Sequence, residues 1–339
     1  MALPDFFLIG APKAGTTALH AALARHPGLY LSPVKEPKYY LCDGAPPVAR
    51  AGPGDAHSAR EWVWDRDRYS ALFAAAPEGA LRGESTPFYL YDRAAHLRIK
   101  RDVPDARLIA VLRDPVDRAH SNWMHLWSDG LEPIGDFVEA CEAEDDRIAA
   151  GYAPFWHYRS VGRYGEQLAH LYSVFDRSQV HVLRYRQLVD SPVETLAAIG
   201  RFLGVDGLAS APRAENSRPY VADTRQARAL GRAIRAGAAA GALLPPQVWR
   251  RASRPLVAAR HRNGARRPVL SPGERRAVLA PLADDIALLS EVTGESYADW
   301  LGDRGRGEFG PRAEAASRVD SDTVGAAGDA GSEGSVAVS

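Results

Sequence analysis

Apolar runs alternate with amphipathic segments along much of the chain. Residues 5–10 form a short apolar run that ends in glycine, and residues 16–26 then follow a helical period up to Pro27. A second apolar run lies at 28–33, and a continuous one at 107–112 ends in Arg-Asp-Pro. Short continuous apolar runs bounded by turn residues are typical of buried strands.

Further elements repeat the alternation. Pro115, suited to a first helical turn, predicts a helix that begins there, and Ser191 with Glu194 predicts a capping box at the start of another. The remaining expected elements are a helix within 65–76, a strand and turn within 80–92, a helix at 162–175 and a strand at 179–188. Strands that alternate with helices predict an α/β fold, here P-loop-like and three-layered (α/β/α) with a central parallel sheet.

The patterning divides the chain into one domain and a tail. Residues 1–302 are expected to form a single domain, in which 43–80 and 128–160 lack a clean period and are interpreted as excursions on the acceptor side. Residues 303–339 are rich in Gly, Ala, Ser and Asp, with a last aromatic residue at Phe309. Such a composition buries too little apolar surface to fold, so a disordered tail is predicted.

Composition excludes several classes of protein. Lys+Arg and Asp+Glu number 42 each in 339 residues, so the chain carries no overall field to attract nucleic acid. The two cysteines, Cys42 and Cys141, are too few for a disulfide framework and suit a reducing compartment. The first residues lack a signal-peptide pattern, and no apolar run approaches the roughly 18 residues of a transmembrane helix. A cytoplasmic protein is expected.

The loop after the first predicted strand nearly matches a nucleotide-binding motif. Residues 10–17 fit G-x-x-x-x-G-K-[ST] except that Thr16 occupies the lysine position, while Lys13 stands three residues earlier. A strand–loop–helix junction directs backbone N–H groups and a helix dipole at an anion. Lys13, Ala14, Gly15, Thr16 and Thr17 are therefore predicted to bind one 5′-phosphate that carries one transferable group, rather than a triphosphate with its metal.

Two segments, in order, indicate a family. Residues 6–17 resemble the 5′-phosphosulfate loop of sulfotransferases that use 3′-phosphoadenosine 5′-phosphosulfate (PAPS), and residues 108–123 are similar to their 3′-phosphate motif. The resemblance implies that Arg113 and Ser121 bind the 3′-phosphate. Segments 83–91, 161–205 and 264–300 are similar to the branch that includes heparan sulfate sulfotransferases, so the likeness extends from about residue 5 to 301.

The resemblance implies a reaction and roles for residues. A sulfuryl group would pass from PAPS, as co-substrate, to a hydroxyl (or amine) of a carbohydrate or small-molecule metabolite by in-line displacement without a metal. Lys13 would stabilise the bridging oxygen, and Glu36 would act as general base. A C-terminal arginine, Arg266 or else Arg262 or Arg267, would reach the 3′-phosphate. The chain departs from the family at Ser85, where a lysine is expected.

Other interpretations remain open at the level of sequence. A P-loop kinase or NTPase is disfavoured by Thr16, and a non-catalytic nucleotide-binding protein is disfavoured because Lys13 and Glu36 are both retained. Glu36 also fits a solvated charge cluster with Lys35 and Lys38. An aromatic group fits an acceptor pocket or a core equally well; its members are Trp62, Trp64, Trp123, Trp127, Phe155, Trp156 and Tyr158.

Overall fold

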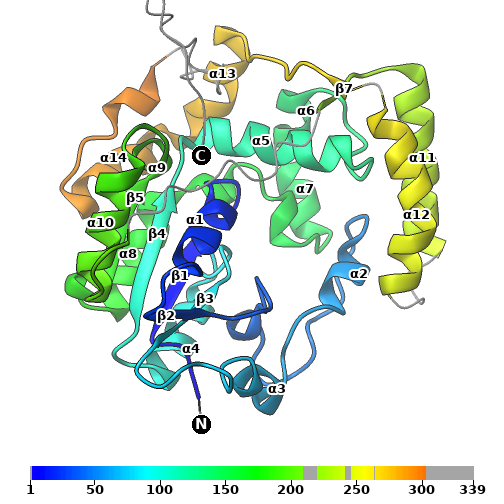
Figure 1. Cartoon of the computed structure of the whole chain (residues 1–339). Coiled ribbons are helices and arrows are strands. Elements are labelled where there is room, and N and C mark those ends of the chain that lie inside the picture. The colour runs from blue at the N-terminus through cyan, green and yellow to red at the C-terminus, as the bar shows by residue number, and fades with distance from the viewer. Residues whose placement is uncertain (1, 209–219, 241–245, 263, 303–339) are drawn as a thin grey trace, which may run out of the picture. The chain divides into compact units, whose positions relative to one another are not determined.

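The computed structural model describes residues 2–208, 220–240, 246–262 and 264–302 (Figure 1). These residues all lie in one compact unit of the chain, residues 1–305. The tail predicted at 303–339 lies outside the described residues.

The centre of this unit is a parallel sheet of five strands in the order β2-β3-β1-β4-β5. The strands are β1 (Phe6–Gly10), β2 (Leu29–Leu31), β3 (Leu81–Ser85), β4 (Arg107–Leu112) and β5 (Val180–Arg184). Four consecutive side chains of β1, Phe6 to Ile9, are at most 1% exposed. An apolar run without alternation is the signature of a strand covered on both faces, which confirms the α/β fold class.

The strand order places a topological switch point between β1 and β4. The chain leaves β1 toward β2 and β3 on one side, then crosses back over β1 to β4 and continues outward to β5. Because parallel crossovers are right-handed, connections that run in opposite directions along the sheet lie on opposite faces. The loops after β1 and β4 therefore diverge, and the crevice between them is where open α/β sheets bind ligands.

Helices and one small ribbon complete the unit. The helices are α1 (Thr16–Leu23), α2 (Asp55–Ala59), α3 (Arg66–Ala71), α4 (Arg93–Asp102), α5 (Pro115–Ser128), α6 (Phe137–Glu142), α7 (Glu144–Ala149), α8 (Tyr164–Val174), α9 (Tyr185–Asp190), α10 (Pro192–Leu203), α11 (Arg225–Ala240), α12 (Pro246–His261), α13 (Pro272–Leu279) and α14 (Ala283–Thr293). Strands β6 (Tyr220–Val221) and β7 (Gly264–Ala265) pair antiparallel, which the sequence pattern did not predict.

Two local predictions are corrected by the structure. The strand predicted at 179–188 ends at Arg184, and the chain turns into α9 at Tyr185. Ser191 precedes α10 but makes no side-chain cap, so the capping box predicted there is wrong. The reason is that the α9–α10 junction is already tied by the Thr195 hydroxyl, which donates to the carbonyl oxygens of Gln187 (2.9 Å) and Ser191 (2.7 Å).

Helices α8 and α14 pack closely because α8 has a glycine at the contact. The amides of Gly165 and Glu166 both donate to the carboxylate of Asp285 on α14, each at 2.9 Å, and this carboxylate caps the start of α8. A Cβ at Gly165 would overlap the carbonyl oxygen of Asp285 and lie 2.9 Å from the Leu289 nitrogen. The absence of a side chain at 165 thus sets the distance between the helices.

Gly165→Ala is expected to destabilise the fold by about 1–3 kcal/mol, the usual cost of overpacking, since the obstructing atoms are backbone. Gly273→Ala is the matched control: position 273 is helical, and the nearest atom to a new Cβ is 3.9 Å away. The control should be neutral or stabilising by up to about 1 kcal/mol. Urea unfolding measures both, and equal midpoints for the two variants would contradict the prediction.

Candidate active site

The loop between β1 and α1 has the geometry of an anion site. Gly15 precedes α1 with φ 81°, in the left-handed region, and α1 has no side-chain cap. The first amides of a helix lack intrahelical partners, so those at Thr16 and Thr17 are oriented to bind a ligand. A Cβ at Gly15 would lie 2.8 Å from Cε2 of Tyr185, so glycine is required here both by φ and by space.

Arg113 joins this loop to the end of β4. Its Nη1 donates to the carbonyl oxygen of Lys13 at 2.9 Å, and its guanidinium lies over the Tyr185 ring at 5.1 Å from the centroid. Arg113 itself is 8% exposed. The structure therefore brings together Lys13, Gly15 and Arg113 across the switch point. Tyr185 was missed by sequence reasoning, although its place directly after a strand was a usable signal.

Ser121 and Arg266 are placed by α5. Ser121 is half-buried near the middle of that helix. At the last turn of α5, the Trp127 indole donates to the Val221 carbonyl of β6 (2.8 Å), and β6 pairs with β7, which directly precedes Arg266. Arg266 is exposed and begins the segment that leads from β7 to α13. Its role and that of Ser121 stay predictions.

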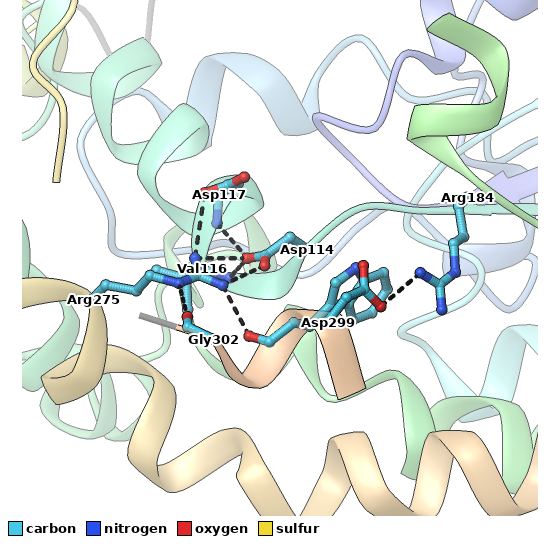
Figure 2. Close-up of polar contacts among 8 residues, drawn as sticks. Asp114, Val116, Asp117, Arg184, Arg275, Asp299 and Gly302 are labelled. Carbon is cyan, nitrogen blue, oxygen red and sulfur yellow. Dashed lines mark hydrogen bonds and ion pairs between the residues drawn. The ribbon is translucent and has the colours of Figure 1, made fainter. Parts of the chain in front are cut away.

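A buried ion pair fastens the C-terminal part of the unit to the residue next to Arg113 (Figure 2). Asp114 caps α5 by accepting from the amides of Val116 and Asp117, both at 3.0 Å. Its carboxylate also receives both Nη atoms of Arg275, at 3.2 and 2.5 Å, and Arg275 is 1% exposed. No sequence pattern indicated this pair, since the two residues are 161 positions apart.

Arg275 also holds the residues that follow α14. Its Nη2 donates to the carbonyl oxygen of Trp300 at 2.9 Å and its Nε to that of Gly302 at 2.8 Å (Figure 2). A second contact pins the same segment to the end of β5, because Arg184 donates to Asp299 at 2.8 Å. Distant parts of the chain therefore fix the strand ends from which Arg113 and Tyr185 project.

Glu36 lies in a strained loop after β2, beside the end of β3. Glu36 and Lys38 have φ of 59° and 61°, left-handed values that cost a non-glycine residue on the order of 1–3 kcal/mol. The Glu36 carboxylate pairs with Lys35 Nζ at 2.6 Å, and its amide donates to the Ser85 carbonyl at 2.9 Å. Burial lowers the pKa of Lys38, an effect that the charge of Glu36 opposes. The charge cluster is thus partly desolvated rather than fully solvated.

His20 belongs to the same cluster and was missed by sequence reasoning. Its Nδ1 lies 2.8 Å from the Ser85 hydroxyl. Burial and then the charge of Lys35 lower the pKa of His20 to about 4, which Glu36 opposes, so the imidazole is neutral at neutral pH. The signal was available, because His20 is four residues after Thr16 and so shares its face of α1. A neutral Ser–His pair stands where the family resemblance implies a lysine.

The two predicted excursions contact each other. The carboxylate of Asp55 in α2 accepts from the Trp156 indole (3.0 Å) and from the Ala153 amide (2.8 Å). Trp156 is 1% exposed, and Trp123 and Trp127 stack on each other with centroids 6.2 Å apart. Of the aromatic group, Trp123, Trp127, Trp156 and Tyr158 therefore belong to the core.

Metal sites and membrane spans were searched over the described ranges only. No group of three or more His, Cys, Asp or Glu residues there is arranged to hold a metal ion. No helix in those ranges has the length and apolar character needed to cross a membrane.

The sequence is similar to those of known proteins. A sequence profile described as "Sulfotransferase family" matches residues 4–209. Human heparan sulfate glucosamine 3-O-sulfotransferase 3B1 is 28% identical over 203 residues, which cover 60% of this chain and 46% of that protein. Human carbohydrate sulfotransferase 15 is 25% identical over 278 residues, covering 66% and 48% respectively. The chain spans about half the length of these curated relatives.

A solved structure is similar over most of the chain. The sulfotransferase from Alicyclobacillus acidocaldarius has a TM-score of 0.68 and 28% sequence identity, and the match covers 89% of this chain and 100% of that one. The likeness reaches well beyond the residues that the family profile matches.

Arg275→Met is expected to cost about 3–5 kcal/mol of stability, because it leaves the Asp114 carboxylate without its buried cation. The matched control is the adjacent, exposed Arg276→Met, which should stay within about 0.5 kcal/mol of the wild type. Thermal and urea unfolding of both variants measure the difference. Similar values for the two arginines would show that the ion pair contributes little.

Proposed function

The chain belongs to the sulfotransferase family, and from that premise we propose that it transfers the sulfuryl group of PAPS to a hydroxyl of a carbohydrate or small metabolite. The observation that carries the proposal is the junction at the switch point. There the uncapped α1 and the left-handed Gly15 face the crevice, and Arg113 is bonded to Lys13 across it. This junction fits a ligand that carries an anion at each end.

Different groups of the chain are proposed to bind the two ends of the donor. The amides from Lys13 to Thr17 and the α1 dipole bind the 5′ end, while Arg113 and Ser121 bind the 3′-phosphate, with Arg266 approaching from the β7 side. Bound PAPS supplies the sulfuryl group and leaves as adenosine 3′,5′-bisphosphate. Because Arg113 also bonds the Lys13 carbonyl, the two anion sites are held at a fixed separation.

Catalysis then requires little beyond charge and position. Lys13 stabilises the negative charge that grows on the bridging oxygen, a contribution of about 10²–10³ in rate for one such donor. Glu36 accepts the proton of the attacking hydroxyl. The Lys35 ammonium, at 2.6 Å, holds that carboxylate in place. Transfer without a metal stays a prediction, as does a cytoplasmic location.

The acceptor is proposed to be a carbohydrate, in line with the activities for which the two human relatives are named. The neutral His20 imidazole, whose Nδ1 is bonded to the buried Ser85 hydroxyl, has its Nε2 left as a hydrogen-bonding group suited to an uncharged hydroxyl. Residues 43–80 and 128–160, joined through Asp55, are proposed to form the acceptor side.

Arg113→Ala should weaken binding of adenosine 3′,5′-bisphosphate by about 1.5–3 kcal/mol, the worth of a charged hydrogen bond. Arg101→Ala, at an exposed arginine paired with Asp102, is the control and should bind as the wild type does. Isothermal titration calorimetry with and without Mg²⁺ measures both variants, and circular dichroism checks folding. Wild-type protein that ignores the bisphosphate but binds ATP with Mg²⁺ would instead favour a kinase or NTPase.

Glu36→Gln should leave affinity for the bisphosphate within about two-fold and lower turnover by about 10²–10⁴, the range for general base catalysis. Turnover is measured as transfer of labelled sulfuryl from PAPS to glucosamine–uronate oligosaccharides, N-acetylglucosamine oligomers and 4-nitrophenol. The control is Glu78→Gln, at an exposed position before β3. Undiminished transfer by Glu36→Gln would assign the base to another residue.

A further inference from the structure

The loop that carries Glu36 holds a conformation that its own residues disfavour. Glu36 and Lys38 both have positive φ, although neither is glycine, and Pro37 separates them. The left-handed region brings Cβ close to the following carbonyl oxygen, so single non-glycine residues adopt it where surrounding contacts hold them. Two such residues within three positions require stabilising contacts from other segments of the chain.

Two of these stabilising contacts come from the end of β3. The Glu36 amide donates to the Ser85 carbonyl at 2.9 Å, and the Lys38 amide donates to the Thr86 hydroxyl oxygen at 3.3 Å. The Pro37 carbonyl between them accepts from the Val63 amide at 2.9 Å. The Lys38 carbonyl accepts from the Leu41 amide within the same segment, at 3.1 Å. The other three contacts are made to neighbouring segments, and the one to Thr86 depends on a side chain.

A buried carboxylate orients that side chain. Glu84 is 0% exposed, and its Oε1 accepts from the Thr86 hydroxyl at 2.6 Å, while Oε2 accepts from the Tyr69 hydroxyl. When the Glu84 carboxylate is ionised it can only accept, so the Thr86 proton then points at Glu84 and a lone pair is left for the Lys38 amide. Burial raises the pKa of Glu84 to about 7, against the effect of these hydrogen bonds, so this orientation is favoured most above about pH 7.

We propose that Thr86 and Glu84 are positioning residues for the reaction. Glu84 orients the Thr86 hydroxyl, the hydroxyl holds the Lys38 amide, and the loop so fixed presents the Glu36 carboxylate at the end of the sheet. The inference rests on the proposed role of Glu36 as base. The inference goes beyond that role, because it assigns a part in turnover to Thr86 and Glu84, which would touch neither substrate.

The geometry predicts that the effect of Thr86 and Glu84 on turnover is separable from donor binding. The donor side is fastened by Arg113 and the Lys13 carbonyl, whereas the loop from Glu36 to Lys38 is held by contacts from Ser85, Val63 and Thr86. Loss of the Thr86 hydroxyl should therefore move the base and leave the nucleotide loop in place.

The first test removes that hydroxyl and asks whether the loop loosens. Thr86→Val is expected to speed amide hydrogen exchange in peptides spanning residues 35–41 by about ten-fold or more, while Thr86→Ser, which keeps the hydroxyl, restores slow exchange. Affinity for adenosine 3′,5′-bisphosphate should stay within about two-fold in both. Thr195→Val is the matched control: Thr195 is also buried, and its hydroxyl also makes two hydrogen bonds, but at the α9–α10 junction.

Exchange in 35–41 that is unchanged by Thr86→Val, or equally fast in Thr86→Ser, overturns the proposal. Faster exchange in Thr195→Val as well would mean a general loss of stability and would also overturn it. Glu84→Gln provides a second route if Thr86→Val folds poorly. It keeps the shape and should loosen the same peptides, because a glutamine amide can present a donor to Thr86.

The second test asks whether the conformation of the loop affects turnover. With the acceptors named above, Thr86→Val should lower kcat about ten-fold or more with little change in the KM for PAPS, and Thr86→Ser should recover most of it. In a Glu36→Gln background, Thr86→Val should have less than about a two-fold further effect, because it acts through the residue already removed. Effects that multiply would show independent action and refute the inference. Full turnover by Glu36→Gln alone would instead refute the assigned base, whereas the exchange result would still report on the loop.

Discussion

The parallel register of β1 between β3 and β4 is the constraint on which the rest of the structure depends. It delivers the loops after all three strands to one edge of the sheet, because parallel strands end on the same side. The hydrogen bond from Arg113 to the Lys13 carbonyl then joins the loops after β1 and β4. The hydrogen bond from the Glu36 amide to Ser85 ties the loop after β2 to the end of β3.

Each half of this edge is fastened by a carboxyl group that is wholly or largely buried. On the donor side, Asp114 caps α5 and pairs with Arg275, which draws the segment around Trp300 against the sheet. On the base side, Glu84 accepts hydroxyl hydrogen bonds from Thr86 and Tyr69. Burying a charge costs free energy, and hydrogen bonds offset that cost only where the geometry is good. The molecule thus gives up some stability to hold two loops in defined conformations.

Both halves contain left-handed backbone at residues that are not glycine. The loop after β1 has Gly15, where φ and the neighbouring Tyr185 exclude a side chain, but it also has Lys13 at φ 69°. The loop after β2 places Glu36 and Lys38 in the same region of φ. Lys13 and Glu36 are the proposed catalytic residues, and glycine cannot replace their side chains, so contacts from other segments have to balance the strain.

Sequence by itself determined the fold class, and it predicted the strand–loop–helix junction at Gly15, since both depend on local signals. The apolar runs of β1 and β4, the glycine at 15 and the place of Arg113 after a strand are all readable from neighbouring positions. The ribbon β6–β7, the missing cap at Ser191 and the core location of Trp156 were decided by tertiary structure. So were the approach of His20 to Ser85, the pair of Asp114 with Arg275, and the contact of Thr86 with Lys38. These contacts join residues 48 to 161 positions apart, and chain patterning carries no record of which distant groups the folded backbone will bring within hydrogen-bond distance.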